Sequence, residues 1–204
     1  MRIGVLTLQG GVEEHLEILD GLGADTRRVR MPRELDGLDG IVIPGGEPTV
    51  IDKLARTFDL ADPLAAAIGG GLPTLATCAG LVYCARDLDN PAPGQQTLGV
   101  LDVTVRCNAF GSQRHSAEQA VPVGEGLTVD ASFIRAPIVT RVGECVEVLS
   151  RVPGPDGEPV VVGVRAGAVT ALSFHPEENG DDRVHAAWLR AAALVEKFSN
   201  HVFA

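Results

Sequence analysis

The sequence predicts an α/β fold: a three-layer sandwich in which helices cover both faces of a mainly parallel central sheet, with antiparallel strands added to it. In the first half, short apolar runs alternate with stretches whose apolar residues recur at helical spacing, which is typical of parallel strands buried on both faces. After Asp89, strand-like segments follow one another with only turns between them, which indicates antiparallel pieces. Because 204 residues with 45% hydrophobic content can bury a substantial core, a single domain over residues 1–204 is expected.

The first half is expected to contain strands over residues 3–8, 26–30, 40–43 and 72–77, of which the second is the most exposed. Helices are expected from residue 12 to 22, from 49 onward, over about 63–68, and directly after Cys78. The first helix is indicated by apolar residues at helical spacing with acidic residues between them, followed by Gly23 as a C-terminal cap. Gly-rich turns follow the first and third strands, at Gln9-Gly10-Gly11 and Pro44-Gly45-Gly46. The ends of parallel strands meet at one edge of a sheet, where ligands bind, so these turns and Cys78 are expected to converge.

The second half is expected to be rich in strands, which are predicted over residues 98–105, 119–123, 127–133, 137–142, 145–149, 160–164 and 169–174. A closing helix over residues 181–198 is indicated by Val184, Trp188 and Ala192 at helical spacing.

The composition excludes several classes of partner. The formal net charge is −10, and no basic cluster is longer than Arg27-Arg28, so neither nucleic acid nor an anionic membrane is an expected partner. Residues 63–85 carry no charged side chain, but Gly69-Gly70-Gly71 and Pro73 interrupt them, which argues against a membrane span. The apolar run at residues 3–8 is too short for a secretory signal.

The four cysteines form no CxxC pair and have no metal-ligand spacing with histidine. A reducing cytoplasm is therefore the expected location, and neither a metal nor a cofactor is expected. Cys84 and Cys145 are interpreted as buried core thiols. His15, His115, His185 and His201 belong to no motif and are interpreted as surface or packing residues.

Cys78 lies where an apolar strand is expected to turn directly into a helix, with Ala76, Ala79 and Gly80 around it. A turn of this kind is a candidate nucleophile elbow, because it pushes the side chain out at the sheet edge and aims helix N–H groups at whatever the sulfur attacks. A cysteine in an apolar run is also commonly a small core residue. The rest of the chain therefore has to supply a base and a pocket.

His175-Pro176-Glu177 follows the last expected strand and supplies such a base. Pro176 disfavours helical geometry at His175, so an extended segment is predicted, in which residues 175 and 177 project to the same side. Glu177 can then accept a hydrogen bond from one nitrogen of the His175 imidazole, while the other nitrogen of the ring faces a thiol. Cys78, His175 and Glu177 are thus the predicted nucleophile, base and orienting carboxylate.

Several motifs together carry a resemblance to a known family. Thr77-Cys78-Ala79-Gly80, His175-Pro176-Glu177 and Pro44-Gly45-Gly46-Glu47 resemble the triad-type (class I) glutamine amidotransferases. Within that group, the chain is similar to the glutaminase subunits of the pyridoxal 5′-phosphate synthase complex. The closer similarity rests on the segments at residues 4–10, 108–111, 133–137 and 146–150, which occur in family order along nearly the whole chain.

The resemblance implies a class I glutamine amidotransferase fold and hydrolysis of L-glutamine to L-glutamate and ammonia through a thioester on Cys78. The N–H groups of Gly46 and Ala79 would form the oxyanion hole. The substrate would contact Gly45, Gly46, Glu47, Pro48, Cys107, Asn108, Ile134 and Arg135. The Gln9-Gly10 turn would switch the oxyanion hole on when the partner docks. That partner is a (β/α)₈-barrel synthase subunit, which would use the ammonia for pyridoxal 5′-phosphate (vitamin B6) biosynthesis.

The sequence departs from the family pattern in the expected pocket. Pro48 replaces a usual serine, and Cys107 and Ser112 stand where arginines are common. Arg106 is one residue out of register and would lie on the opposite face of a strand; Arg114 is the other candidate replacement. Two alternatives therefore stay open. The chain can be another Cys-His hydrolase of this fold, such as a γ-glutamyl hydrolase or a peptidase-like enzyme, or a docking subunit with weakened catalysis.

Overall fold

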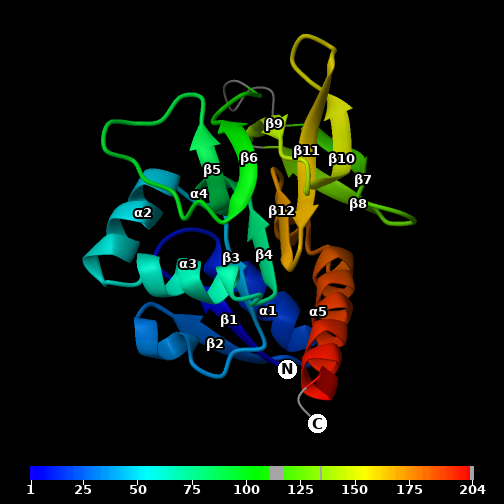
Figure 1. Cartoon of the computed structure of the whole chain (residues 1–204). Helices are drawn as coiled ribbons and strands as arrows, with labels where there is room; N and C mark the ends of the chain where they lie inside the picture. The colour runs from blue at the N-terminus through cyan, green and yellow to red at the C-terminus, as the bar shows by residue number, and fades with distance from the viewer. Residues whose placement is uncertain (111–116, 134, 203–204) are drawn as a thin grey trace.

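The computed structural model describes residues 1–110, 117–133 and 135–202, and a ten-stranded mixed sheet lies at its centre (Figure 1). Five strands of this sheet run parallel; four of them come from the first half of the sequence, as predicted, and the fifth comes from the second half. In spatial order they are β2 (Asp25–Val29), β1 (Arg2–Leu6), β3 (Gly40–Ile43), β4 (Thr74–Thr77) and β12 (Val169–Leu172).

The rest of the sheet is mainly antiparallel, also as predicted. β11 (Pro159–Ala166) pairs antiparallel with β12, with β9 (Ile138–Val142) and with β10 (Glu147–Pro153). β9 continues antiparallel to β6 (Leu101–Arg106), which pairs parallel with the edge strand β5 (Ala85–Leu88). β7 (Ala117–Pro122) and β8 (Thr128–Phe133) form a separate two-stranded sheet. The sequence did not predict β5, because its four residues include two charged ones and show no apolar run.

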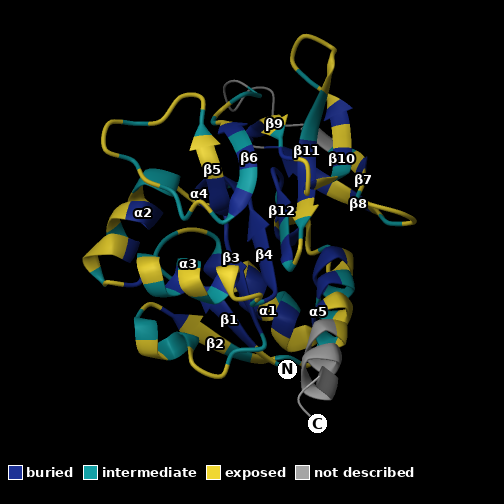
Figure 2. Ribbon diagram, viewed as in Figure 1, coloured by how far each residue is buried: buried dark blue, intermediate teal, exposed yellow. Residues whose placement is uncertain are grey.

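The helices divide between the two faces of the sheet. α2 (Pro48–Thr57), α3 (Ala61–Gly69) and α4 (Ala79–Cys84) contribute to one apolar cluster, and α1 (Val12–Gly21) and α5 (Arg183–Val202) contribute to the other. The strands between them alternate: Ile41 and Ile43 belong to the first cluster and Val42 to the second. The described residues also contain two short 3₁₀ turns, η1 (Pro32–Leu35) and η3 (Glu177–Asn179). The central strands are accordingly buried on both sides (Figure 2), so the three-layer prediction is confirmed.

The strand register brings four turns to one edge of the sheet. β3 aligns Ile43 with Ala76 of β4, and β12 aligns Leu172 with Thr77 of β4. β1 runs parallel beside β3. Because these strands are parallel and in step, the segments that follow them emerge together, as predicted. This edge carries Gln9-Gly10, Gly45-Gly46, Cys78 and His175.

The thiols differ in burial, and one prediction about them is wrong. Cys84 is buried in α4, as predicted, but Cys145 is exposed. Its strand was placed too early: β10 begins at Glu147, and Cys145 belongs to the turn before it. All four cysteines are free thiols. Among the helices in the described residues, none combines the length and apolar character needed to cross a membrane.

Candidate active site

Cys78 occupies a strained turn between β4 and α4. Its backbone has φ 46° and ψ −101°. Residues other than glycine adopt such a conformation at a cost of roughly 1–3 kcal/mol. The Cys78 N–H donates to the Leu172 carbonyl at 2.7 Å, which ties the turn to the end of β12. Gly80 is required beside it, because a Cβ there would lie 2.2 Å from the Ile43 carbonyl oxygen. These features are those of the nucleophile elbow that the sequence predicts.

His175 and Glu177 form a hydrogen-bonded pair, but not through the extended segment that the sequence predicts. Pro176 instead has φ −66° and ψ −30° and caps η3, so the chain turns and brings Glu177 back to the imidazole. His175 Nδ1 lies 2.8 Å from Glu177 Oε1. Proline restricts the residue before it, yet its own φ is compatible with a helical turn. His175 itself pairs with Ser132 in an antiparallel β-bridge, so the extended prediction holds at His175 and is wrong from Pro176 onward, while the predicted contact between the two side chains is present.

The neighbours of His175 and Glu177 shift the pKa values of both groups. Burial alone lowers the pKa of His175, but hydrogen bonds to Cys78 and Glu177 and the charges of these groups raise it to about 11. Burial would raise the pKa of Glu177, but the charges and hydrogen bonds of His15 and His175 hold it well below its usual range. The arrangement therefore favours an imidazolium at His175 beside an ionised Glu177, and a positive charge next to a cysteine is what makes its sulfur nucleophilic.

The two Gly-rich turns pack directly against this group. A Cβ on Gly10, which has φ 110°, would lie 1.7 Å from the Gly45 carbonyl oxygen, and a Cβ on Gly46 would lie 2.4 Å from Gln9 Oε1. Gln9 Oε1 also accepts a hydrogen bond from the Glu47 N–H at 2.6 Å. The Gln9-Gly10 turn is thus in contact with the backbone at Gly46.

Gly45 packs so closely against His175 that a side chain at this position would affect the imidazole. A Cβ on Gly45 would lie 2.1 Å from His175 Cε1, so Gly45→Ala has to displace the imidazole. A displacement of about 1 Å costs on the order of 100-fold in turnover, and we expect that loss in kcat. Gly21→Ala is the matched control, because a Cβ there meets nothing within 4 Å. Steady-state kinetics of both variants with L-glutamine, the substrate that the resemblance implies, check this, and an unchanged kcat in Gly45→Ala would contradict it.

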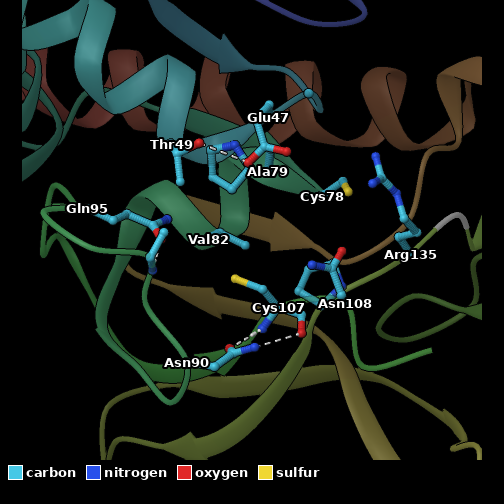
Figure 3. A pocket seen from close by; sticks show the side chains of 14 residues that line it. Glu47, Thr49, Cys78, Ala79, Val82, Asn90, Gln95, Cys107, Asn108 and Arg135 are labelled. Atoms are coloured by element: carbon cyan, nitrogen blue, oxygen red, sulfur yellow. Dashed lines mark hydrogen bonds between the residues drawn. The ribbon is translucent and has the colours of Figure 1, made fainter. Parts of the chain in front are cut away.

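A cavity of about 190 Å³ opens beside Cys78 (Figure 3). It is smaller than the roughly 300–1,000 Å³ of drug-sized ligand sites, so it suits a small metabolite. Its lining includes the predicted contact residues Gly46, Glu47, Pro48, Cys107, Asn108 and Arg135, together with Ala79. Gly45 does not line this cavity and lies against His175 instead, and Ile134 lies outside the described residues. Cys107 and Asn108 lie across the cavity from Glu47 and Ala79 (Figure 3).

The structure clarifies the departures from the family pattern. The Cys107 N–H donates to Asn90 Oδ1 at 2.9 Å, and the Cys107 carbonyl oxygen accepts from Asn90 Nδ2 at 3.2 Å. Burial raises the pKa of the Cys107 thiol to about 11. Arg106 is exposed and pairs with Asp89 at 3.3 Å, outside the cavity lining, as its register predicts. Pro48 is the first residue of α2, where a missing N–H costs no helical hydrogen bond. Ser112 and Arg114 lie outside the described residues.

Two histidines that the sequence interpretation set aside lie directly behind the triad. His15 and His185 are fully buried, so the surface alternative was wrong for both. His15 Nε2 lies 3.3 Å from Glu177 Oε1. The signal for burial was present, because His15 falls with Val12 and Leu19 on the apolar face of α1. His115 and the side chain of His201 lie outside what the structure describes.

Comparisons with known proteins agree with this geometry. The model of the SNO glutamine amidotransferase family matches residues 5–194. Pyridoxal 5′-phosphate synthase subunit PdxT of Corynebacterium glutamicum strain R is 64% identical over 193 residues, 93% of this chain and 94% of the relative. The protein of the same name from Cutibacterium acnes is 60% identical over 191 residues, 92% of this chain and 95% of the relative.

A solved structure agrees as well. A crystal structure described as a glutamine amidotransferase superposes with a TM-score of 0.85 at 42% identity and covers 94% of this chain and 98% of its own. The family match and these identities extend over nearly the whole chain, including the segments that bear Cys78 and His175. The chain therefore belongs to the SNO glutamine amidotransferase family.

Proposed function

We propose that this chain hydrolyses L-glutamine to L-glutamate and ammonia and delivers the ammonia to a (β/α)₈-barrel synthase subunit that makes pyridoxal 5′-phosphate. The observation that carries the hydrolysis is Cys78 in a strained elbow that lines the same pocket as His175, whose imidazole Glu177 holds at 2.8 Å. The names of the relatives in Corynebacterium and Cutibacterium support the synthase assignment. The four free thiols fit a reducing cytoplasm.

The first half of the reaction forms a thioester. The Cys78 sulfur attacks the side-chain amide carbon, and the carbonyl oxygen takes the negative charge. As the C–N bond breaks, the His175 imidazolium donates its proton to the departing nitrogen, which leaves as ammonia. The elevated pKa of His175, about 11, keeps that proton available at neutral pH.

The second half returns the enzyme to its starting state. His175, now neutral, takes a proton from water, and the hydroxide attacks the thioester carbon. The Cys78 thiolate leaves, glutamate is released, and the imidazolium is restored. Glu177 keeps the imidazole in the orientation that both proton transfers need.

The oxyanion of both steps is stabilised by the N–H groups of Gly46 and Ala79. Ala79 is the first residue of α4, so its N–H has no partner within the helix, and Gly46 lines the same cavity. Loss of one such donor typically costs about 3 kcal/mol of transition-state stabilisation. Because Gln9 holds the Glu47 N–H and Gly10 packs on Gly45, docking of a partner against the Gln9-Gly10 turn can set the direction of the Gly46 N–H.

Glu47 and Arg135 hold the amino-acid end of glutamine. Both line the cavity beside Cys78, and their opposite charges match an ammonium and a carboxylate. We expect Arg135→Ala to raise KM for glutamine roughly 10- to 100-fold with a smaller change in kcat, because a hydrogen bond to a charged group contributes about 1.5–3 kcal/mol. Arg106→Ala is the matched control, since Arg106 pairs with Asp89 instead. Equal KM values for the two variants would remove Arg135 from the binding site.

The direct test measures ammonia release from glutamine by the full chain, alone and with the barrel subunit. We expect release that rises when the subunit is added. Release of ammonia or amine from γ-glutamyl peptides in preference to glutamine would instead support the γ-glutamyl hydrolase or peptidase-like alternative. Complex formation with no turnover would support a docking subunit.

A further inference from the structure

A buried chain of polar side chains lies behind Glu177, on the side away from the cavity. His185 Nε2 lies 2.8 Å from His15 Nδ1, and His15 Nε2 lies 3.2 Å from Thr77 Oγ1 and 3.3 Å from Glu177 Oε1. Thr77 donates to the same Glu177 oxygen at 3.3 Å and accepts from the Gly45 N–H at 3.1 Å. The chain therefore joins α5, α1 and β4 to the carboxylate that holds the base.

The direction of these hydrogen bonds follows from the acceptors. Glu177 is an anion and only accepts, so the ring nitrogen of His15 that faces it, Nε2, carries a proton. His15 Nδ1 lies 2.8 Å from His185 Nε2, and one of these two nitrogens donates to the other. His185 Nδ1 has no partner among the described residues. Burial, and next the charge of His15, lower the pKa of His185 to about 3, so its ring stays neutral.

We propose that His15, supported by His185, is a positioning residue that fixes Glu177 as an oriented anion and thereby sustains the Cys78–His175 pair. This role rests on the proposed function. Neither histidine lines the cavity, so neither contacts the substrate. Both act through Glu177, which is only 4% exposed and cannot obtain a replacement donor easily from solvent.

The alternative is that two buried histidines only satisfy each other inside the core. Three donors, from His175, Thr77 and His15, converge on one oxygen of Glu177, and an anion held by several donors resists protonation. A core pair without a role would have no effect on the reactivity of Cys78. The two accounts therefore differ in the pH at which Cys78 becomes reactive.

Other titratable groups surround Glu177 and are unchanged in the test. They are Glu14 on α1, His175 and Glu178 on the same segment as Glu177, and Asp181 just before α5. If His15 is lost, Glu177 loses one of the three donors that hold its oxygen, the carboxylate orients the imidazolium less well, and the thiolate of Cys78 forms only at a higher pH.

The experiment follows alkylation of the full-length protein by iodoacetamide across pH, with mass spectrometry of the peptides that contain Cys78 and Cys145. Because Cys145 is exposed and remote from the triad, it serves as the internal control. We expect His15→Leu to move the Cys78 profile to higher pH by about one unit or more, since a hydrogen bond to a charged group contributes that much. The Cys145 profile should not move. His15→Gln, whose amide can replace the Nε2 donor, should restore most of the difference.

Leu16→Ala is the matched control for packing, because it opens the same face of α1 without touching the chain of hydrogen bonds. It should lower the melting temperature and leave the Cys78 profile in place. If His15→Leu does not fold, His185→Leu tests the same chain and should give a smaller shift in the same direction. An unmoved Cys78 profile in the folded variants, or an equal shift in Leu16→Ala, overturns the proposal.

Alkylation needs no glutamine, so it separates the two claims. Absence of glutamine turnover in the wild type would defeat the proposed function, and the alkylation profiles would still decide the role of His15. Where the wild type is active, His15→Leu should also lose kcat roughly tenfold while KM for glutamine is unchanged.

Discussion

Replacing Cys78 with alanine is expected to abolish glutamine hydrolysis and to leave the fold intact. No other nucleophile in the cavity can take over, because burial raises the pKa of the Cys107 thiol to about 11 and keeps it protonated at neutral pH. The substitution removes one sulfur from a partly exposed position, so little packing is lost. Ammonia release and the melting temperature, measured on the same preparation, check both halves of the expectation.

Because the backbone at Cys78 is strained, the stability of two inactive variants can also be compared. At φ 46°, alanine keeps the strain and glycine relieves it, so Cys78→Gly should be more stable than Cys78→Ala by about 1 kcal/mol although both are inactive. Cys145→Ala is the control that should keep full activity, because that thiol is exposed and remote from the triad. Substantial ammonia release by Cys78→Ala, or its unfolding at room temperature, would show that Cys78 is a structural residue.

Replacing Glu177 with glutamine is expected to lower kcat by roughly 10²- to 10⁴-fold, less than the loss of the thiol. Loss of an orienting carboxylate leaves the nucleophile and base in place but allows the wrong imidazole tautomer. Hydrogen bonding and charge from Glu177 are among the causes that raise the pKa of His175, so removing the anion lowers that pKa. The protonated imidazole that serves the leaving ammonia is then lost at a lower pH.

The measurement is the pH dependence of kcat for the wild type and for Glu177→Gln. The alkaline limb of the variant should lie at lower pH than that of the wild type. Glu178→Gln is the matched control, because its carboxylate is half exposed and 3.9 Å from the imidazole. The orienting role would be wrong if the two variants behaved alike, and it would be understated if Glu177→Gln lost as much activity as Cys78→Ala.

The parts of the site that depend on local sequence could be predicted. An apolar strand that ends in a small-residue turn gives Cys78 its position, and parallel strands bring the Gly45-Gly46 turn to the same edge. Gly10 and Gly45 could be recognised as turn residues without knowing what they contact. The contact of His175 with Glu177 followed from their spacing, although the path of the chain through Pro176 did not.

The parts that depend on distant packing could not be predicted. His15 and His185 are 170 residues apart, and only the packing of α1 beside α5 brings them together behind Glu177. The sequence pattern of a histidine on an apolar helix face is the same whether the histidine packs against leucine or against another histidine. The prediction that Cys145 is buried is wrong for a simpler reason. A strand boundary displaced by two residues moves a side chain from the core into a turn.

The most direct test of the account is the site of modification by a glutamine-shaped electrophile, measured by mass spectrometry in the presence of the barrel subunit. We predict one equivalent of label on Cys78, prevented by excess glutamine, and none on Cys107, which lines the same cavity as a protonated thiol. Label on Cys107, or no labelling that glutamine prevents, would contradict Cys78 as the nucleophile of a glutaminase.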